Sequence, residues 1–116
     1  MARDDYFIIV YQLLSYLYQC LKKGEKVNPK YLKADSPFFK QTLADSYWRY
    51  ILKHMVSQNY IEGIVVDDTI DNAGTLIYNL EEATITPEGI EYLNDNSVLS
   101  KVREFAKGIK ESVPFI

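Results

Sequence analysis

Apolar side chains in the first part of the chain recur at steps of three and four residues, which is the period of one face of an α-helix. This pattern predicts a helix over residues 4–23, with Gly24 as its stop signal after Lys22 and Lys23. The apolar stripe of this helix consists of Tyr6, Ile9, Val10, Leu13, Leu14, Leu17 and Leu21. We expect the stripe to pack on the core of the domain.

Two further segments have the signals of a helix-turn-helix. Asn28-Pro29 is typical of a helix start and predicts a short helix that ends near Ala34. A turn or a short helical piece follows over residues 35–39, and Thr42-Leu43-Ala44-Asp45 has the spacing of a capping box. A third helix is therefore predicted over residues 43–58.

The helix predicted over residues 43–58 has two distinct faces. Its apolar stripe, which we expect to face the core, consists of Trp48, Ile51, Leu52, Met55 and Val56. The other face carries hydrogen-bond donors and cations of the kind that a recognition helix aims at base edges and phosphates: Ser46, Arg49, Tyr50, Lys53, His54 and Ser57. A solvated helix face that happens to hold Arg and Lys is the alternative interpretation.

A strand, a polar loop and a returning strand follow this helix. Asn59 can take the left-handed conformation that ends a helix, and residues 60–66 form an apolar run typical of a strand. Residues 67–74 are rich in turn formers, and residues 76–85 predict the returning strand, with a break at residues 81–82. This hairpin would be the wing of a winged helix.

The loop of the predicted wing is acidic. It holds Asp67, Asp68 and Asp71, where many DNA-binding winged helices carry Lys or Arg. Approach of these carboxylates to phosphate would be repulsive, because DNA binding depends on the neutralisation of phosphates. The sequence therefore argues against contact between the wing and DNA.

Two helices are predicted after the wing. Thr86-Pro87-Glu88 supplies a cap, a first-turn proline and an acidic residue that complements the helix dipole, so a helix should run to about Asp95. Apolar residues from Val98 to Ile109 predict a last helix, which could close the core or form a homodimer through terminal helices. The order of elements predicts an α+β fold: a single winged-helix domain over residues 1–116, with a helix-turn-helix, a two- to three-stranded β wing and additional C-terminal helices.

Composition places the chain among ordinary folded domains. Its 116 residues are 47% hydrophobic and 25% charged, and no apolar run approaches the roughly 20 residues of a membrane span. A single cysteine, Cys20, forms no disulfide framework and suits a reducing compartment. We therefore expect a cytoplasmic protein with no membrane partner.

The net charge of −3 is unevenly distributed along the chain. Residues 1–60 hold nine Lys or Arg and five Asp or Glu, whereas residues 61–116 hold four and eleven. The basic part coincides with the predicted reading helices, and such polarity can orient a protein on a polyanion. Scattered solvated charges are the alternative interpretation.

Residues suited to catalysis or metal binding are sparse. His54 is the only histidine, Cys20 lies in an apolar helix, and neither a glycine-rich phosphate loop nor an HExxH spacing occurs. We expect no enzymatic activity, no cofactor and no metal site.

The chain resembles a known family, most clearly in its second half. The resemblance is carried by Tyr60-Ile61-x-Gly63, by the segment Ile85-Thr86-Pro87-Glu88-Gly89-Ile90-Glu91-Tyr92-Leu93, and by the stretch from Ser100 to Glu111. These segments look like the YjcQ-like family, small winged-helix proteins of Gram-positive bacteria and their prophages. The resemblance covers most of the chain and is best from Trp48 onward. It implies the fold, whereas the family has no established activity and no agreed functional residues.

Two functions fit these predictions. In the first, the chain is a DNA-binding protein, a prophage-associated transcriptional regulator, whose third helix enters the major groove of double-stranded DNA. Arg49 and Lys53 would contact bases or phosphates, and Lys30, Lys33 and Lys40 would anchor the backbone. In the second, the chain is a protein-protein interaction module whose acidic wing and carboxyl half meet a basic partner. We favour the first on fold analogy and on the basic first half.

Overall fold

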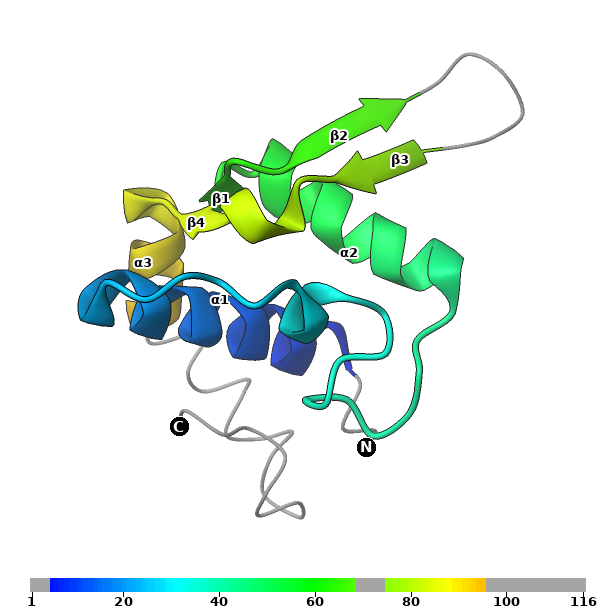
Figure 1. The fold of residues 1–116 in the computed structure, drawn as a ribbon, viewed down its shortest axis with the longest axis horizontal. Coiled ribbons are helices and arrows are strands. Elements are labelled where there is room, and N and C mark those ends of the chain that lie inside the picture. The colour runs from blue at the N-terminus through cyan, green and yellow to red at the C-terminus, as the bar shows by residue number, and fades with distance from the viewer. Residues whose placement is uncertain (1–4, 69–74, 96–116) are drawn as a thin grey trace.

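The computed structural model describes residues 5–68 and 75–95 (Figure 1). Its elements are, in order, α1 (Tyr6–Lys23), the 3-10 helix η1 (Pro29–Leu32), α2 (Asp45–Ser57), β1 (Ile61–Glu62), β2 (Val65–Asp68), β3 (Thr75–Tyr78), the 3-10 helix η2 (Leu80–Glu82), β4 (Thr84–Ile85) and α3 (Pro87–Asn94). Helices followed by an antiparallel hairpin and a further helix make a winged-helix arrangement of the α+β class. The predicted fold class is confirmed.

The four short strands form two antiparallel pairs. β1 pairs with β4, with Ile61 opposite Ile85. β2 pairs with β3, with Val65 opposite Tyr78 at one end and Asp68 opposite Thr75 at the other. The β2–β3 hairpin is the wing, and Figure 1 shows it above α2, whereas α1 and η1 lie below. The wing and α1 therefore occupy opposite sides of the structure.

Helix α1 is the centre of the core. The side chains of Ile8, Ile9 and Leu14 have no exposed surface, and the helix packs against α2, α3 and β4. At about 25 cal/mol per Å² of apolar surface removed from water, this burial is the main stabilising interaction of the fold. The predicted stripe packs on the core except at Leu21, which is 49% exposed because the last turn of the helix, up to Gly24, faces solvent.

Three predicted helix signals are confirmed by the structure. Gly24 ends α1 in the left-handed conformation, with φ 66°. The side chain of Asn28 accepts a hydrogen bond from the backbone N–H of Lys30 (3.1 Å) at the start of η1. Thr86 Oγ1 accepts one from the N–H of Gly89 (3.0 Å) at the start of α3. These groups satisfy or replace backbone hydrogen bonds that helix ends leave unmade.

The predicted capping box at the start of the third helix is wrong. Helix α2 begins at Asp45, two residues later than predicted, and its N-cap, Ala44, makes no side-chain hydrogen bond. The reason is Leu43, whose side chain is buried and whose backbone N–H donates to the carbonyl oxygen of Ala34 (2.9 Å). Because Leu43 ties the connecting loop to the core, helical geometry starts only after it. The segment before this loop is a single 3-10 turn that ends at Leu32.

Gly63 divides the strand that was predicted over residues 60–66. It lies between β1 and β2 with φ 95°, and a Cβ at this position would collide with the carbonyl oxygen of Glu82. The two backbones can therefore approach closely only at a residue without a side chain. The predicted break of the returning strand at residues 81–82 is confirmed, because η2 occupies it.

Some predictions lie outside the described residues. They are the last helix, with the homodimer surface that it could form, and Asp71 of the wing loop. In the described part of the chain, no helix combines the length and the apolar character that crossing a bilayer requires.

Tyr60 and Tyr92 pack against the core beside α3. The ring centroids of Tyr60 and Tyr92 lie 4.7 Å apart, and Tyr92 is half-buried. Burial raises the pKa of the Tyr92 phenol above its usual range, and the nearby Tyr6, Tyr60 and Asp95 add to this shift. Burial also raises the pKa of Tyr6. The folded state therefore favours the neutral form of these phenols.

Replacement of Gly63 by alanine is expected to destabilise the protein by at least about 3 kcal/mol, because a backbone collision adds to the strain of a positive φ. Gly24→Ala is the matched control, since Gly24 also has a positive φ (66°) but a Cβ there meets nothing within 4 Å. Its cost should be about 1 kcal/mol. Urea unfolding of both variants measures the difference, and equal losses would contradict the importance of the contact with Glu82.

The raised pKa of Tyr92 predicts a loss of stability at alkaline pH. The contribution of the neutral phenol is fully present below the unfolded pKa of about 10 and is lost as the pH rises above it. The free energy of unfolding, measured in urea from about pH 9 to about pH 11, should therefore fall for the wild type. Tyr92→Phe cannot ionise at this position and should lose less. An equal fall in the free energy of unfolding of the two proteins would show that ionisation of Tyr92 does not cause the loss of stability.

Candidate nucleic-acid interface

The outward face of α2 is set by the residues that bury its other side. Ile51, Leu52 and Met55 are at most 2% exposed, and Trp48 Nε1 donates a hydrogen bond to the carbonyl oxygen of Leu32 (2.8 Å). These contacts hold the helix against the core and η1. With 3.6 residues per turn, they direct the opposite face away from the core. That face carries Ser46, Arg49, Tyr50 and Lys53.

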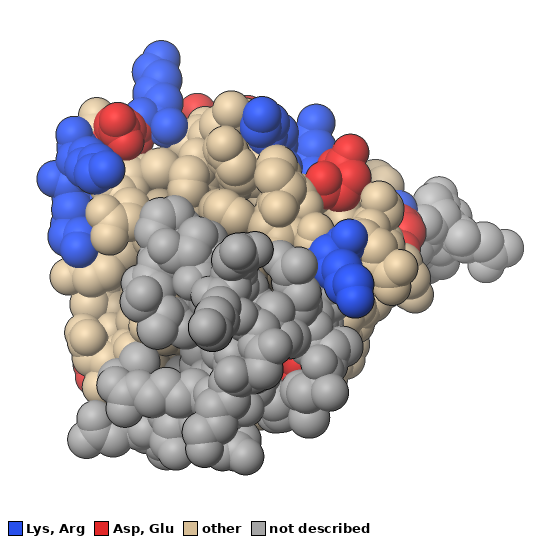
Figure 2. Space-filling model, turned by 90° about the horizontal axis from the view of Figure 1, so that it is seen from below, with Lys and Arg blue, Asp and Glu red and all other residues tan. Residues whose placement is uncertain are grey.

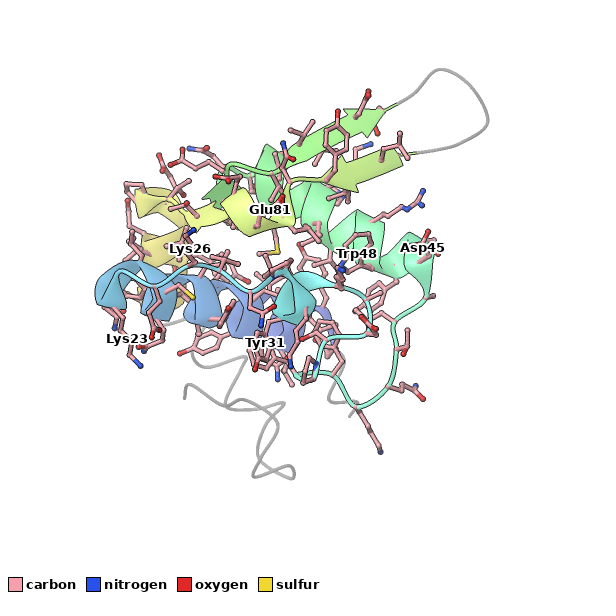
Figure 3. The ribbon with its side chains drawn as sticks, viewed as in Figure 1. Lys23, Lys26, Tyr31, Asp45, Trp48 and Glu81 are labelled. Carbon is pink, nitrogen blue, oxygen red and sulfur yellow. The ribbon has the colours of Figure 1, made fainter. Side chains whose placement is uncertain are left out.

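An open groove of about 350 Å³ lies between α2 and the wing. Its lining comes from α2 and from the first residue of β3: Asp45, Ser46, Arg49, Tyr50, Lys53 and Thr75. The structure thus brings together four residues that the sequence predicted for the site, and it adds Asp45 and Thr75. Figure 3 marks Asp45 at the amino end of α2 and Trp48 on the side toward η1.

Each of the two cations in the groove has a carboxylate partner. Arg49 Nε lies 2.9 Å from Asp45 Oδ2, and Lys53 Nζ lies 3.2 Å from Asp68 Oδ2. Thr75 Oγ1 donates a hydrogen bond to Asp68 Oδ1 (2.6 Å), and this bond, followed by that from Lys53, lowers the pKa of Asp68. Because both pairs are exposed to water, they contribute little to stability. Their main effect is to neutralise the groove.

Tyr50 forms the aromatic edge of the groove. The residue is 54% exposed, and its ring centroid lies 4.3 Å from that of His54 and 6.2 Å from that of Tyr6 at the start of α1. His54 is half-buried and does not line the groove. The structure therefore places His54 as a support for the Tyr50 ring.

The three lysines predicted to anchor a DNA backbone lie outside this groove. Lys30 is on η1, and Lys33 and Lys40 are at exposed positions of the loop between η1 and α2. η1 meets α2 on the side of Trp48, which faces away from the groove. The structure therefore does not bring these lysines together with the cations of α2.

Sequence reasoning missed part of this site. Asp45 could have been found, because it lies four residues before Arg49 on the same helix, which is the spacing of an ion pair. The positions of Asp68 and Thr75 beside Lys53 could not, since they depend on the register of the wing. Within residues 5–68 and 75–95, no group of three or more His, Cys, Asp or Glu side chains is placed to hold a metal ion.

The sequence of the chain, including the residues of the groove, matches a known protein family. The family model described as YjcQ protein matches residues 11–112, which include the groove and the wing. The chain belongs to the YjcQ family. Comparisons of the chain with curated proteins and with solved structures gave no match.

Proposed function

We propose that this member of the YjcQ family binds double-stranded DNA through α2 and acts in the cytoplasm as a transcriptional regulator of the kind that prophages carry. The proposal rests on the groove, where Ser46, Arg49, Tyr50 and Lys53 share the outward face of a helix whose other face is buried. The major groove of B-DNA admits an α-helix of this kind. The winged-helix fold supports the proposal by analogy.

The side chains of the groove suit different contacts with DNA. Arg49 has a planar guanidinium, which can donate two hydrogen bonds to guanine O6 and N7 or hold a phosphate. Lys53 supplies a point charge for a phosphate. Ser46 and Tyr50 supply hydroxyl groups for phosphate or base edges, and both side chains are exposed.

DNA binding by the groove requires that its carboxylates release the two cations. DNA phosphates must displace Asp45 from Arg49 and Asp68 from Lys53. Both pairs are exposed, so the exchange costs little. The acidic wing is repelled by phosphates, and α2 therefore carries the interaction.

Arg49→Ala combined with Lys53→Ala is expected to weaken binding of a fluorescently labelled random duplex at least about 30-fold, since each charge-assisted contact contributes roughly 1 to 3 kcal/mol. Fluorescence anisotropy at low salt and at about 0.2 M salt measures the affinity, which should fall steeply with salt for the wild type.

Gln58→Ala is the control for this experiment. Gln58 is exposed directly after the last residue of α2 and does not line the groove. This control should bind the duplex as the wild type does. Absence of wild-type binding even at low salt would contradict the proposed function.

Asp68→Asn is expected to strengthen DNA binding several-fold, because it removes a charge that repels phosphate and that occupies Lys53. Asp67→Asn is the matched control, since Asp67 is the neighbouring residue on β2 but pairs with Leu76 on the other face of the wing. It removes the same charge and should give a smaller gain in the same anisotropy titration. Equal gains would mean that only net charge matters, against a role of Asp68 in the groove.

A protein-interaction module is the second candidate function, and the outer face of the wing favours it. Leu76 and Tyr78 are 42% and 46% exposed there, on the same face as Asp67. An apolar strip beside an acidic residue fits a partner with a basic surface. In that case DNA would not retain the protein at low salt, and the variant with Arg49→Ala and Lys53→Ala would still bind its partner.

A further inference from the structure

A lysine-rich segment begins in the last turn of α1 and passes through η1. Residues 22–33 hold five lysines and one glutamate, a local charge of +4, and all five lysines are exposed. We name them the lysine band: Lys22, Lys23, Lys26, Lys30 and Lys33. Figure 2 shows, from below, Lys and Arg side chains along the upper and lateral rim of the protein, with Asp and Glu side chains between them.

The lysine band differs from the groove in its contacts. Within the described residues, no salt bridge joins a lysine of the band to a carboxylate, whereas both cations of the groove are paired. Two of the lysines lie over aromatic rings: Lys22 Nζ is 4.4 Å from the centroid of Tyr18, and Lys30 Nζ is 5.3 Å from that of Tyr31. A cation over a ring keeps its charge and its exposed N–H donors. The band therefore presents positive charge that the described fold does not neutralise.

A favourable effect on the stability of the fold accounts for only some of the lysines in the band. Lys22 and Lys23 lie in the last turn of α1, where positive charge interacts favourably with the helix dipole. Lys26 and Lys33 lie on irregular segments and Lys30 lies on a 3-10 turn, where this benefit does not apply. Their accumulation on one connection indicates an anionic ligand.

The backbone beneath the band is held in place by aromatic residues. Tyr16, Tyr31 and Phe38 form a cluster with ring centroids 5.0 to 5.8 Å apart. Tyr16 also accepts a hydrogen bond at its hydroxyl from the backbone N–H of Asn28 (2.8 Å). A backbone that is ordered before binding lowers the entropic cost of association. The lysines therefore project from a preformed support.

The lysine band and the groove lie on different parts of the protein surface. Tyr50, at the edge of the groove, contacts Tyr6 at the amino end of α1, whereas the band starts at the carboxyl end of this helix. The 18 residues of α1 span about 27 Å, which separates Lys22 and Lys23 from Tyr50. Lys30 lies on η1, which meets α2 on the side of Trp48 and not at the groove. In Figure 3, Lys23 and Asp45 accordingly lie at opposite ends of the structure. One DNA segment on α2 would leave the band free for another.

We propose that the lysine band binds the phosphate backbone of a second DNA duplex, so that one protein molecule bridges two DNA segments. The inference rests on the proposed binding of a first duplex by α2. Contacts between lysine ammonium groups and phosphates carry no sequence information, so the second contact is independent of sequence. Displacement of counterions makes this contact salt-dependent, and each phosphate that a lysine contacts adds about −0.9 to the slope of log affinity against log salt.

Bridging is measured by capture of one duplex through another. A duplex fixed to beads is incubated with the protein and with a second, fluorescent duplex, and the fluorescence retained on the beads is recorded. The test variant combines Lys22→Gln, Lys23→Gln, Lys26→Gln, Lys30→Gln and Lys33→Gln. The matched control changes the same five lysines to arginine and so keeps the charge. Thermal unfolding verifies that each variant is folded, as expected for exposed positions.

We expect the wild type and the arginine control to retain the fluorescent duplex, and the glutamine variant to retain at least about tenfold less, because its phosphate contacts are lost. The glutamine variant should still bind a single duplex in anisotropy through α2. Retention equal to that of the wild type would overturn the proposal. Complete loss of single-duplex binding would also overturn it, because one continuous surface would then hold one duplex.

The variant with Arg49→Ala and Lys53→Ala separates this proposal from the proposed function. It should keep weak, salt-sensitive duplex binding through the band and should fail to bridge. A wild type that binds one duplex but captures no second one would overturn bridging alone, whereas a wild type that binds no DNA would overturn both proposals. Binding of the band to vesicles of anionic phospholipid, without capture of DNA, would assign it to a membrane and overturn bridging.

Discussion

Burial of α1 is the interaction on which the rest of the protein depends. This helix packs against α2, α3 and β4, and its central side chains are fully removed from water. Because α2 is held by its own apolar stripe and by Trp48, the direction of its outward face is decided in the core and not by the residues of that face. The polar residues of the groove can therefore change without loss of the fold, which separates the requirements of binding from those of stability.

The backbone geometry at Gly63 affects which charged side chains meet in the groove. Its positive φ and its missing side chain let the chain pass the backbone of Glu82 between β1 and β2. The hairpin register that follows sets Asp68 opposite Thr75 and within 3.2 Å of Lys53. The electrostatic state of the groove thus depends on backbone geometry outside it, and not only on the charges of α2.

Much of the fold could be predicted from the sequence because its signals are local. The spacing of apolar residues in α1, the stop at Gly24 and the cap at Thr86 each act within a few residues. The start of α2 could not be predicted, because burial of Leu43 overrides the local capping pattern. The site shows the same limit: helical periodicity identified the outward residues of α2, whereas their wing partners follow from strand register, which the sequence does not display.

The hydrogen bond from Trp48 to Leu32 joins the helix of the groove to the segment of the lysine band. Trp48 is the only tryptophan of the chain. The emission of an indole depends on the polarity and hydrogen bonding of its surroundings, so this side chain is a built-in optical reporter at the junction of the two surfaces. A displacement of α2 relative to η1 changes its fluorescence, and mechanical coupling between the surfaces can thus be followed in solution without an attached dye.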